Sequence, residues 1–379
     1  MSEQILANAR LVLKDRVVDG HVLVRDGRID DIASGRHIPV GAENLDGDYL
    51  MPGFIELHTD NMEKHFNPRP GVMWPSSLAA ILAHDIQIAG AGITTVLDAI
   101  CVGEYNANQM RRHILTESIA AVKEASSHGL LRSEHLFHMR CEVSDEGVED
   151  MFRPYADEPL VHLVSLMDHT PGQRQWRNME AFKKFYKLEK LSAEELEAEM
   201  AGRIAAQKEF AEKHRKAILE LARPLKLPLA SHDDTTAEHV EEGRIDGVTI
   251  SEFPTTLEAA RAARAAGMGI VMGAPNVVRG GSHSGNVSAL ELAEEGLLDA
   301  LSSDYMPTSL LQAAFVLGEG EFMDLPEAVA TVSANPAAML GMKDRGEIVP
   351  GKRADLIQIR MAGDTPVVCQ VWRQGHRVL

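Results

Sequence analysis

The stretch MPGFIELHTDNMEKH, residues 51–65, combines a turn, a short apolar run and a polar end. Pro52 and Gly53 interrupt the chain, and the run that follows predicts a strand over Phe54–His58. Side chains two residues apart on a strand point to the same face, so His58 and Asp60 can converge on one point. An imidazole nitrogen and a carboxylate oxygen suit a divalent ion such as zinc or manganese. Other strand ends must supply the remaining ligands.

Composition narrows the class of protein. The chain has 379 residues and a net charge of −18, which disfavours a nucleic-acid or anionic-membrane binder because both need a basic face. The three cysteines lie far apart, the start resembles no secretory signal, and no apolar run reaches the ~20 residues of a membrane helix. We therefore expect a cytoplasmic protein that acts on a small molecule.

The middle of the chain, residues 51–344, alternates short apolar runs with helical patterns, as β/α units do. Helices are expected over Ser76–Ala89, Gln109–Ser126, Ser192–Leu221 and Thr256–Ala266, the third opening with a capping box from Ser192 to Glu195. Eight strands favour a closed (β/α)₈ TIM-type barrel over an open sheet. They are expected at Phe54–His58, Thr94–Ala99, Glu134–Glu142, Val161–His169, Pro228–His232, Gly247–Phe253, Gly269–Ala274 and Ala300–Asp304.

The two ends of the chain predict a second, smaller domain. Residues 1–50 contain alternating β-branched runs and turn residues, and residues 345–379 contain the same pattern. Neither end is long enough to bury a sound core by itself. We expect one small β-sandwich formed by both termini, with the barrel inserted between them.

Polar side chains stand at most of the predicted strand ends. They are His58, Asp60, Asp98, Glu142, Asp168, His169, His232, Glu252 and Asp304. The carboxyl ends of barrel strands form the active-site face. Three histidines and three carboxylates suffice for a two-metal site with one bridging carboxylate, which can activate water at neutral pH. The barrel therefore predicts a metal-dependent hydrolase.

PGFIELHTD, followed by spaced His, His and SSD at later predicted strand ends, resembles the pattern of the amidohydrolase superfamily. A closer similarity, over essentially the whole chain, is to the PhnM-type enzymes of the bacterial carbon–phosphorus lyase pathway. It rests on six motifs in order: HTDNMEKHFNPRPGVMWP, SLMDHTPGQRQW, ASHDDTT, EFPTTLEAARA, MGAPNVVRGGSHSGNVSA and LSSDYMP. That resemblance implies hydrolysis of α-D-ribose 1-methylphosphonate 5-triphosphate to the 5-phosphate and diphosphate, in phosphonate catabolism. It also implies one or two divalent ions, with two expected, zinc before manganese, and a homodimer.

The resemblance carries roles onto individual residues. It implies metal ligands at His58, Asp60, Glu142, His169, His232 and Asp304, with Glu142 as the bridging ligand. Asp304 would also be the general base that accepts the proton of the attacking water. Asp60 departs from the usual His-x-His pair of the superfamily. Asp98 and Glu252 could each be a metal ligand, a residue that supports a ligand, or a turn residue, and the sequence does not choose among these roles. Asp233 and Asp234 are expected to orient His232 or a sugar hydroxyl.

A triphosphate requires positive charge beyond that of the metal. Arginine forms planar bidentate contacts with phosphate, and glycine-rich backbone can cradle an anion. The glycine-rich loop at 280–285 has two interpretations, a backbone site that binds an anion and a flexible linker. The expected substrate-binding residues are Lys64, Arg69, Arg140, Arg174, Arg279 and His283.

Two other functions stay open. One is hydrolysis of a carbon–nitrogen bond, as in a deacetylase or cyclic-amide hydrolase, which uses the same metal site but has no use for so many arginines. The other is a non-catalytic barrel that serves as a scaffold and binds no metal. Cys101 could add a soft ligand, and His138 and His162, inside apolar runs, are expected to be core or supporting histidines.

Overall fold

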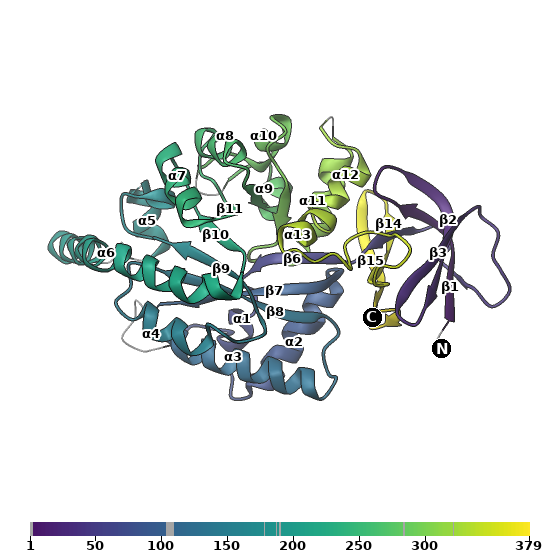
Figure 1. The fold of residues 1–379 in the computed structure, drawn as a ribbon, viewed down its shortest axis with the longest axis horizontal. Helices are drawn as coiled ribbons and strands as arrows, with labels where there is room; N and C mark the ends of the chain where they lie inside the picture. The colour runs from purple at the N-terminus through teal and green to yellow at the C-terminus, as the bar shows by residue number, and fades with distance from the viewer. Residues whose placement is uncertain are drawn as a thin grey trace.

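Eight parallel strands curl into a barrel in the computed structural model, which describes residues 3–103, 110–177, 179–186, 188, 191–282, 285–320 and 322–379. Each strand pairs with the next along the chain, and a parallel bridge between Thr59 and Asp304 joins the last to the first (Figure 1). The strands are β6 Phe54–Thr59, β7 Ile93–Val102, β8 Glu134–Glu142, β9 Val161–Met167, β10 Leu229–His232, β11 Ile250–Glu252, β12 Gly269–Gly273 and β13 Ala300–Ser302.

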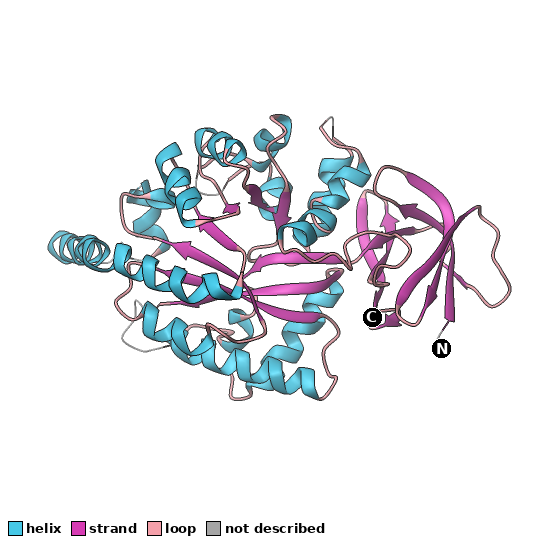
Figure 2. Cartoon of the chain, in the orientation of Figure 1, coloured by secondary structure: helices cyan, strands magenta, loops and turns pink. Residues whose placement is uncertain are grey.

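All eight predicted strands are present, and the barrel prediction is confirmed. The bounds of β8 match the prediction, whereas β11 covers three residues of the predicted Gly247–Phe253. Helix α6 begins where expected, because Ser192 and Glu195 form a reciprocal capping box. Figure 2 shows helices around the outside of the magenta barrel strands.

The helices vary widely in length. The longest, α6, covers 30 residues and extends beyond the barrel wall, with buried residues only in its C-terminal half (Figure 1). The α-helices are α1 Glu63–Phe66, α2 Ser77–Gly90, α3 Met110–Ser127, α4 Val148–Phe152, α5 Met179–Phe185, α6 Ala193–Ala222, α7 Ala237–Asp246, α8 Leu257–Ala265, α9 Ala274–Arg279, α10 Ala289–Glu294, α11 Ser309–Gly318, α12 Leu325–Ala330 and α13 Ala334–Met339. Among the described residues, the 3₁₀ turns include η1 Arg153–Tyr155, η2 Arg174–Arg177 and η4 Arg223–Leu225.

Both ends of the chain build one further sheet beside the barrel. Strand β14 pairs antiparallel with β5, so the C-terminal hairpin continues the N-terminal strands (Figures 1 and 2). Side chains from both halves, among them Leu6, Leu50 and Trp372, share one buried core, so the sheet folds over on itself. Its strands are β1 Glu3–Val12, β2 Val17–Arg25, β3 Arg28–Ser34, β4 Glu43–Asn44, β5 Tyr49–Pro52, β14 Leu356–Ala362, β15 Thr365–Arg373 and β16 His376–Arg377.

Gly53 joins this terminal sheet to the first barrel strand. Strand β5 ends at Pro52 and β6 begins at Phe54, while the Gly53 N–H donates to the Asp355 carbonyl at 2.8 Å. A Cβ on Gly53 would lie 2.9 Å from Cβ of Thr94, so the close approach of β6 and β7 requires glycine. The predicted domain boundaries at 50/51 and 344/345 stay predictions.

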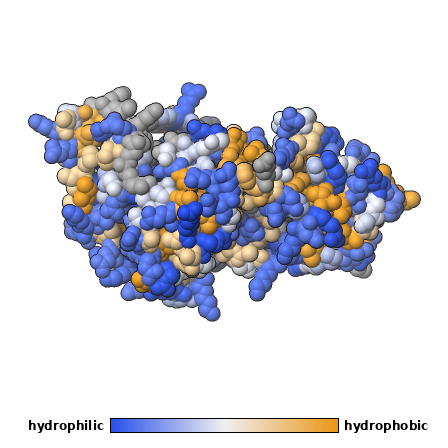
Figure 3. Space-filling view, turned by 90° about the horizontal axis from the view of Figure 1, so that it is seen from above, coloured by the Kyte–Doolittle hydropathy of each residue, from blue (hydrophilic) through white to orange (hydrophobic). Residues whose placement is uncertain are grey.

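The face in Figure 3 is largely hydrophilic, with small hydrophobic groups between. Among the described residues, no helix has the length and apolar character needed to cross a membrane.

Candidate metal centre

The barrel interior has an apolar layer beneath a polar one. Each of the eight strands contributes one residue to a single buried cluster: Leu57, Leu97, Leu136, Leu163, Ala230, Ile250, Val271 and Ala300. Side chains of a strand alternate between its faces, so the inward residue after each of these lies two positions further along. Those positions include His138, His232 and Glu252, all buried. Strand pleating thus carries polar groups to the carboxyl ends of the strands.

A cavity of about 360 Å³ opens at these strand ends. Of the six predicted metal ligands, five line it: His58, Asp60, His169, His232 and Asp304. They come from opposite walls of the barrel, so tertiary structure brings together residues that are up to 246 positions apart. Other lining residues include Glu63, Cys101, Arg111, Arg140, Trp176, Tyr186, Asp233, Phe253, Asn276 and Arg279.

Each of the three cavity histidines places its Nδ1 against a carboxylate. His58 Nδ1 lies 3.1 Å from Glu252 Oε1, and His232 Nδ1 lies 3.4 Å from Glu252 Oε2. Because an ionised carboxylate only accepts, Nδ1 of His58 and of His232 carries the hydrogen, and Nε2 of both rings keeps its lone pair. Burial lowers the pKa of both His58 and His232 well below the usual value, so both rings are neutral. Neutral imidazoles with free Nε2 lone pairs are ready metal ligands.

Asp233 lies where two of these rings meet. Its Oδ2 is 3.5 Å from His232 Nε2 and 3.7 Å from His169 Nε2. The residue has φ of +57°, an uncommon conformation for aspartate that turns its side chain into the cavity. Burial raises its pKa to about 7.

The donor atoms fit a divalent ion. Asp233 Oδ2 and Asp60 Oδ1 are buried and have no hydrogen-bond partner among the described residues. Buried polar atoms are normally paired, so these oxygens lack a ligand that the cavity can hold. Carboxylate oxygens beside imidazole lone pairs are the donor set that zinc and manganese take.

Asp304 sits at the seam where the barrel closes. Its N–H donates to the His58 carbonyl at 3.1 Å, and its carbonyl accepts from the Asp60 N–H at 3.1 Å. The Thr59 hydroxyl donates to the same carbonyl at 2.8 Å. Burial, and then the charge of Asp60, raise the pKa of Asp304 to about 7. The seam therefore holds two carboxylates together at the mouth of the barrel.

Glu142 lies behind His169, outside the lining of the cavity. Its Oε2 is 2.6 Å from His169 Nδ1, and its Oε1 accepts from the His169 N–H at 3.0 Å and the Ser144 hydroxyl at 2.8 Å. This is the arrangement of a carboxylate that orients a histidine. The bridging role expected for Glu142 stays a prediction, and Asp233 is the carboxylate that faces the histidines from within the cavity.

Only some of the predicted anion-binding residues line the cavity. Arg140 and Arg279 line the cavity. Lys64 Nζ instead donates to the Tyr305 carbonyl at 2.5 Å, and Arg69 is exposed outside the cavity lining. Arg174 is buried and paired, as described next, and His283 lies outside the described residues.

Arg174 supports the loop that follows β10. Its Nη1 donates to Asp234 Oδ1 at 2.5 Å and to the His232 carbonyl at 3.0 Å. Only 8% of the residue is exposed. Its guanidinium thus neutralises Asp234 and holds the backbone of a cavity histidine.

Arg140 carries positive charge at the cavity. Its Nε is buried and has no hydrogen-bond partner among the described residues. Burial would lower its pKa, but Cys101, Asp60 and Glu63 close by outweigh that effect and raise it. Arg140 therefore balances acidic residues as well as facing the cavity.

Asp98, at another predicted strand end, belongs to a separate buried network. Its oxygens each lie 2.7 Å from a histidine nitrogen, His84 Nε2 and His135 Nδ1. His135 Nε2 reaches Asp85 Oδ1 at 3.3 Å, and Asn61 Nδ2 reaches His84 Nδ1 at 3.1 Å. The network therefore runs from beneath the barrel wall to the residue that follows Asp60.

Sequence reasoning missed several cavity residues. The sequence predicts only that Asp233 orients His232 or a sugar hydroxyl. The structure gives Asp233 a positive φ and places it in the cavity lining. Arg111 and Glu63 lie on helices α3 and α1, and a strand-end search does not reach them.

Comparison with known proteins identifies the family. Residues 49–378 match the amidohydrolase family. The chain belongs to this family. It is also 44% identical, over 99% of its length and 100% of the relative's, to the alpha-D-ribose 1-methylphosphonate 5-triphosphate diphosphatase of Escherichia coli (strain K12).

Solved structures of the same fold share much less sequence. A 5-methylcytosine deaminase from Klebsiella pneumoniae, liganded with 5-fluorocytosine, superposes with a TM-score of 0.67 at 15% identity, covering 99% of this chain and 97% of that one. A dihydropyrimidinase from Brevibacillus agri superposes with a TM-score of 0.62 at 12% identity, covering 99% and 95%. These similarities show the fold alone.

Proposed function

We propose that this amidohydrolase hydrolyses α-D-ribose 1-methylphosphonate 5-triphosphate to the 5-phosphate and diphosphate, in phosphonate catabolism. The observation that carries the proposal is the 44% identity to the Escherichia coli diphosphatase over the full length of both chains. The cavity supports it, because arginines and metal-ligand groups face the same space. A neutral amide would gain little from the arginines.

The proposed metal ligands are His58, Asp60, Glu142, His169, His232 and Asp304. Two divalent ions held there, zinc first and manganese second, would polarise the phosphate and activate water at neutral pH. Asp304 would accept a proton from the attacking water. Arg140 and Arg279 stabilise negative charge that grows on the leaving diphosphate. The expected homodimer and cytoplasmic location stay predictions.

The direct test uses the metal-loaded protein and the triphosphate substrate. Phosphorus NMR should show stoichiometric release of diphosphate, and ¹⁸O-labelled water should place the label on one product and so identify the phosphorus attacked. Removal of metal with a chelator should stop the release, and zinc or manganese should restore it. Absence of diphosphate release from metal-loaded protein would refute the function.

A panel of acetylated amines and cyclic amides under the same conditions tests the carbon–nitrogen alternative. We expect no turnover of these compounds. A protein that contains no metal and turns over neither class would instead be the scaffold.

A further inference from the structure

Glu252 connects two cavity histidines that come from different sides of the barrel. We propose that Glu252 is a positioning residue that fixes the tautomer and ring orientation of both His58 and His232, so that both Nε2 atoms face the metal site. The proposal depends on the proposed function only in treating these two histidines as metal ligands.

Each oxygen of the Glu252 carboxylate serves a different ring. Oε1 lies 3.1 Å from His58 Nδ1 and Oε2 lies 3.4 Å from His232 Nδ1. The two rings are nearly parallel, with 17° between their planes and 5.5 Å between their centroids. Both imidazoles therefore turn their Nδ1 edges toward one carboxylate, which leaves each Nε2 on the far side of its ring.

The barrel register explains why position 252 can do this. Glu252 is the direct neighbour of His232 on the adjacent parallel strand, and it lies two residues beyond Ile250 of the apolar layer. His58 reaches the other oxygen from β6, across the barrel interior. Glu252 is fully buried, so no solvent competes for its oxygens. A shorter aspartate would not span the two rings, and glutamine would offer one acceptor instead of two.

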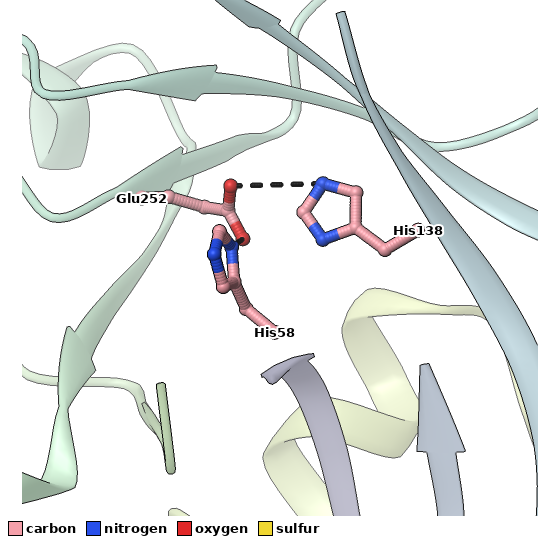
Figure 4. Close-up of side chains that lie close together, drawn as sticks. All are labelled: His58, His138 and Glu252. Atoms are coloured by element: carbon pink, nitrogen blue, oxygen red, sulfur yellow. Dashed lines mark hydrogen bonds and ion pairs between the residues drawn. The ribbon is translucent and has the colours of Figure 1, made fainter. Parts of the chain in front are cut away.

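His138 is the third histidine near this carboxylate, and its contact is of another kind. Figure 4 shows the Glu252 carboxylate beside His58 and facing His138, and its dashed line marks the 3.8 Å from His138 Nε2 to Glu252 Oε2. His138 Nδ1 lies 3.0 Å from the Leu57 carbonyl, which fixes its hydrogen on Nδ1. Its Nε2 therefore faces Glu252 as a lone pair, without a hydrogen bond.

This arrangement has a competing interpretation. The ligand atoms of His58, His138 and Glu252 lie within 4.8 Å of one another, so the three could themselves hold an ion beneath the cavity. An ion bound through His58 Nδ1, the atom that lies 3.1 Å from Glu252 Oε1, would require a lone pair on that nitrogen. The two interpretations therefore assign opposite tautomers to His58.

The first experiment reads those tautomers directly in the unsubstituted, metal-free protein. Long-range ¹H–¹⁵N NMR of ¹⁵N-histidine-labelled protein distinguishes Nδ1–H from Nε2–H rings, and His58→Gln and His232→Gln samples assign the two signals. We expect Nδ1–H for both. An Nε2–H ring at either position overturns the proposal.

The second experiment measures metal binding in Glu252→Gln. The glutamine amide must face one of the two rings with N–H, which turns that ring into the Nε2–H tautomer and removes one ligand. We expect Co²⁺ to bind one site roughly 10- to 100-fold more weakly and with an altered visible spectrum. The matched control is His138→Gln, which changes a neighbour of the same carboxylate and should retain the parent affinity and spectrum.

The outcomes separate the alternatives. Parent affinity and spectrum in Glu252→Gln, or loss of one Co²⁺ equivalent in His138→Gln, would overturn the proposal. If Glu252→Gln does not fold, the tautomers of His58 and His232 in the unsubstituted protein still test the proposal. A protein that binds Co²⁺ as expected but releases no diphosphate would refute the proposed function and leave the role of Glu252 intact.

Discussion

The buried His135 should make the free energy of unfolding depend strongly on pH. Its Nδ1 lies 2.7 Å from Asp98 Oδ2 and its Nε2 lies 3.3 Å from Asp85 Oδ1, with all three side chains fully enclosed. Burial alone would lower the pKa of this imidazole, but the two carboxylates outweigh burial and raise it to about 9. His135 therefore stays protonated in the folded protein at neutral pH.

The size of the effect follows from the shift. An unfolded histidine has a pKa of about 6.5, so a folded pKa of about 9 corresponds to about 3 kcal/mol. Because the folded pKa is the higher one, this stabilisation is fully present below about pH 6.5. It is lost as the pH rises through 9. We expect the free energy of unfolding to fall by about this amount between pH 6 and pH 9.5.

Urea denaturation of metal-free protein at both pH values measures the loss. His135→Gln carries no titrating group, so its free energy of unfolding should change by about 3 kcal/mol less than the parent's over the same interval. His128→Gln, at the exposed position directly after α3, controls for the removal of a histidine as such. A parent and a His135→Gln variant with the same pH dependence would refute the reasoning.

Three further predictions concern the active site and the barrel junction. Asp304→Asn should lower turnover by roughly 10²- to 10⁴-fold with the fold retained, and near-parent rates from metal-loaded variant would exclude it as the base. Arg279→Ala, at the cavity rim, should raise KM roughly 10- to 100-fold. Arg36→Ala, in the loop that follows β3 of the terminal sheet, should leave KM unchanged. Gly53→Ala should lower the free energy of unfolding by about 1–3 kcal/mol, because the added Cβ would clash with the Thr94 side chain. The shift in melting temperature measures this loss. Adding Thr94→Ala should recover part of the loss, and a Gly53→Ala protein as stable as the parent would contradict the clash.

Local features of the fold could be predicted because they depend on neighbouring residues. Short apolar runs between helical patterns indicated all eight barrel strands, and Ser192 with Glu195 indicated where α6 begins. Both signals arise from side-chain alternation and local hydrogen bonds. The strand-end rule also located the cavity, because the carboxyl ends of parallel strands share one end of a barrel.

The roles of the individual carboxylates and arginines could not be predicted in the same way. Glu142 lies behind His169, Arg174 forms an ion pair with Asp234, and Asp233 faces into the cavity. Each of these outcomes depends on a partner from another strand or on one unusual backbone angle. The spacing of residues along the chain shows neither the partner from another strand nor the backbone angle.

By itself, the sequence determined the alternation of strands and helices, the barrel, and the polar strand ends that begin with His58 and Asp60. Only the tertiary structure decided which of those polar groups meet. The reason is that hydrogen bonds and ion pairs act over about 3 Å, and barrel closure alone brings β6, β10 and β11 within that range. Glu252 shows this most clearly, because its two histidines lie 194 and 20 residues away along the chain.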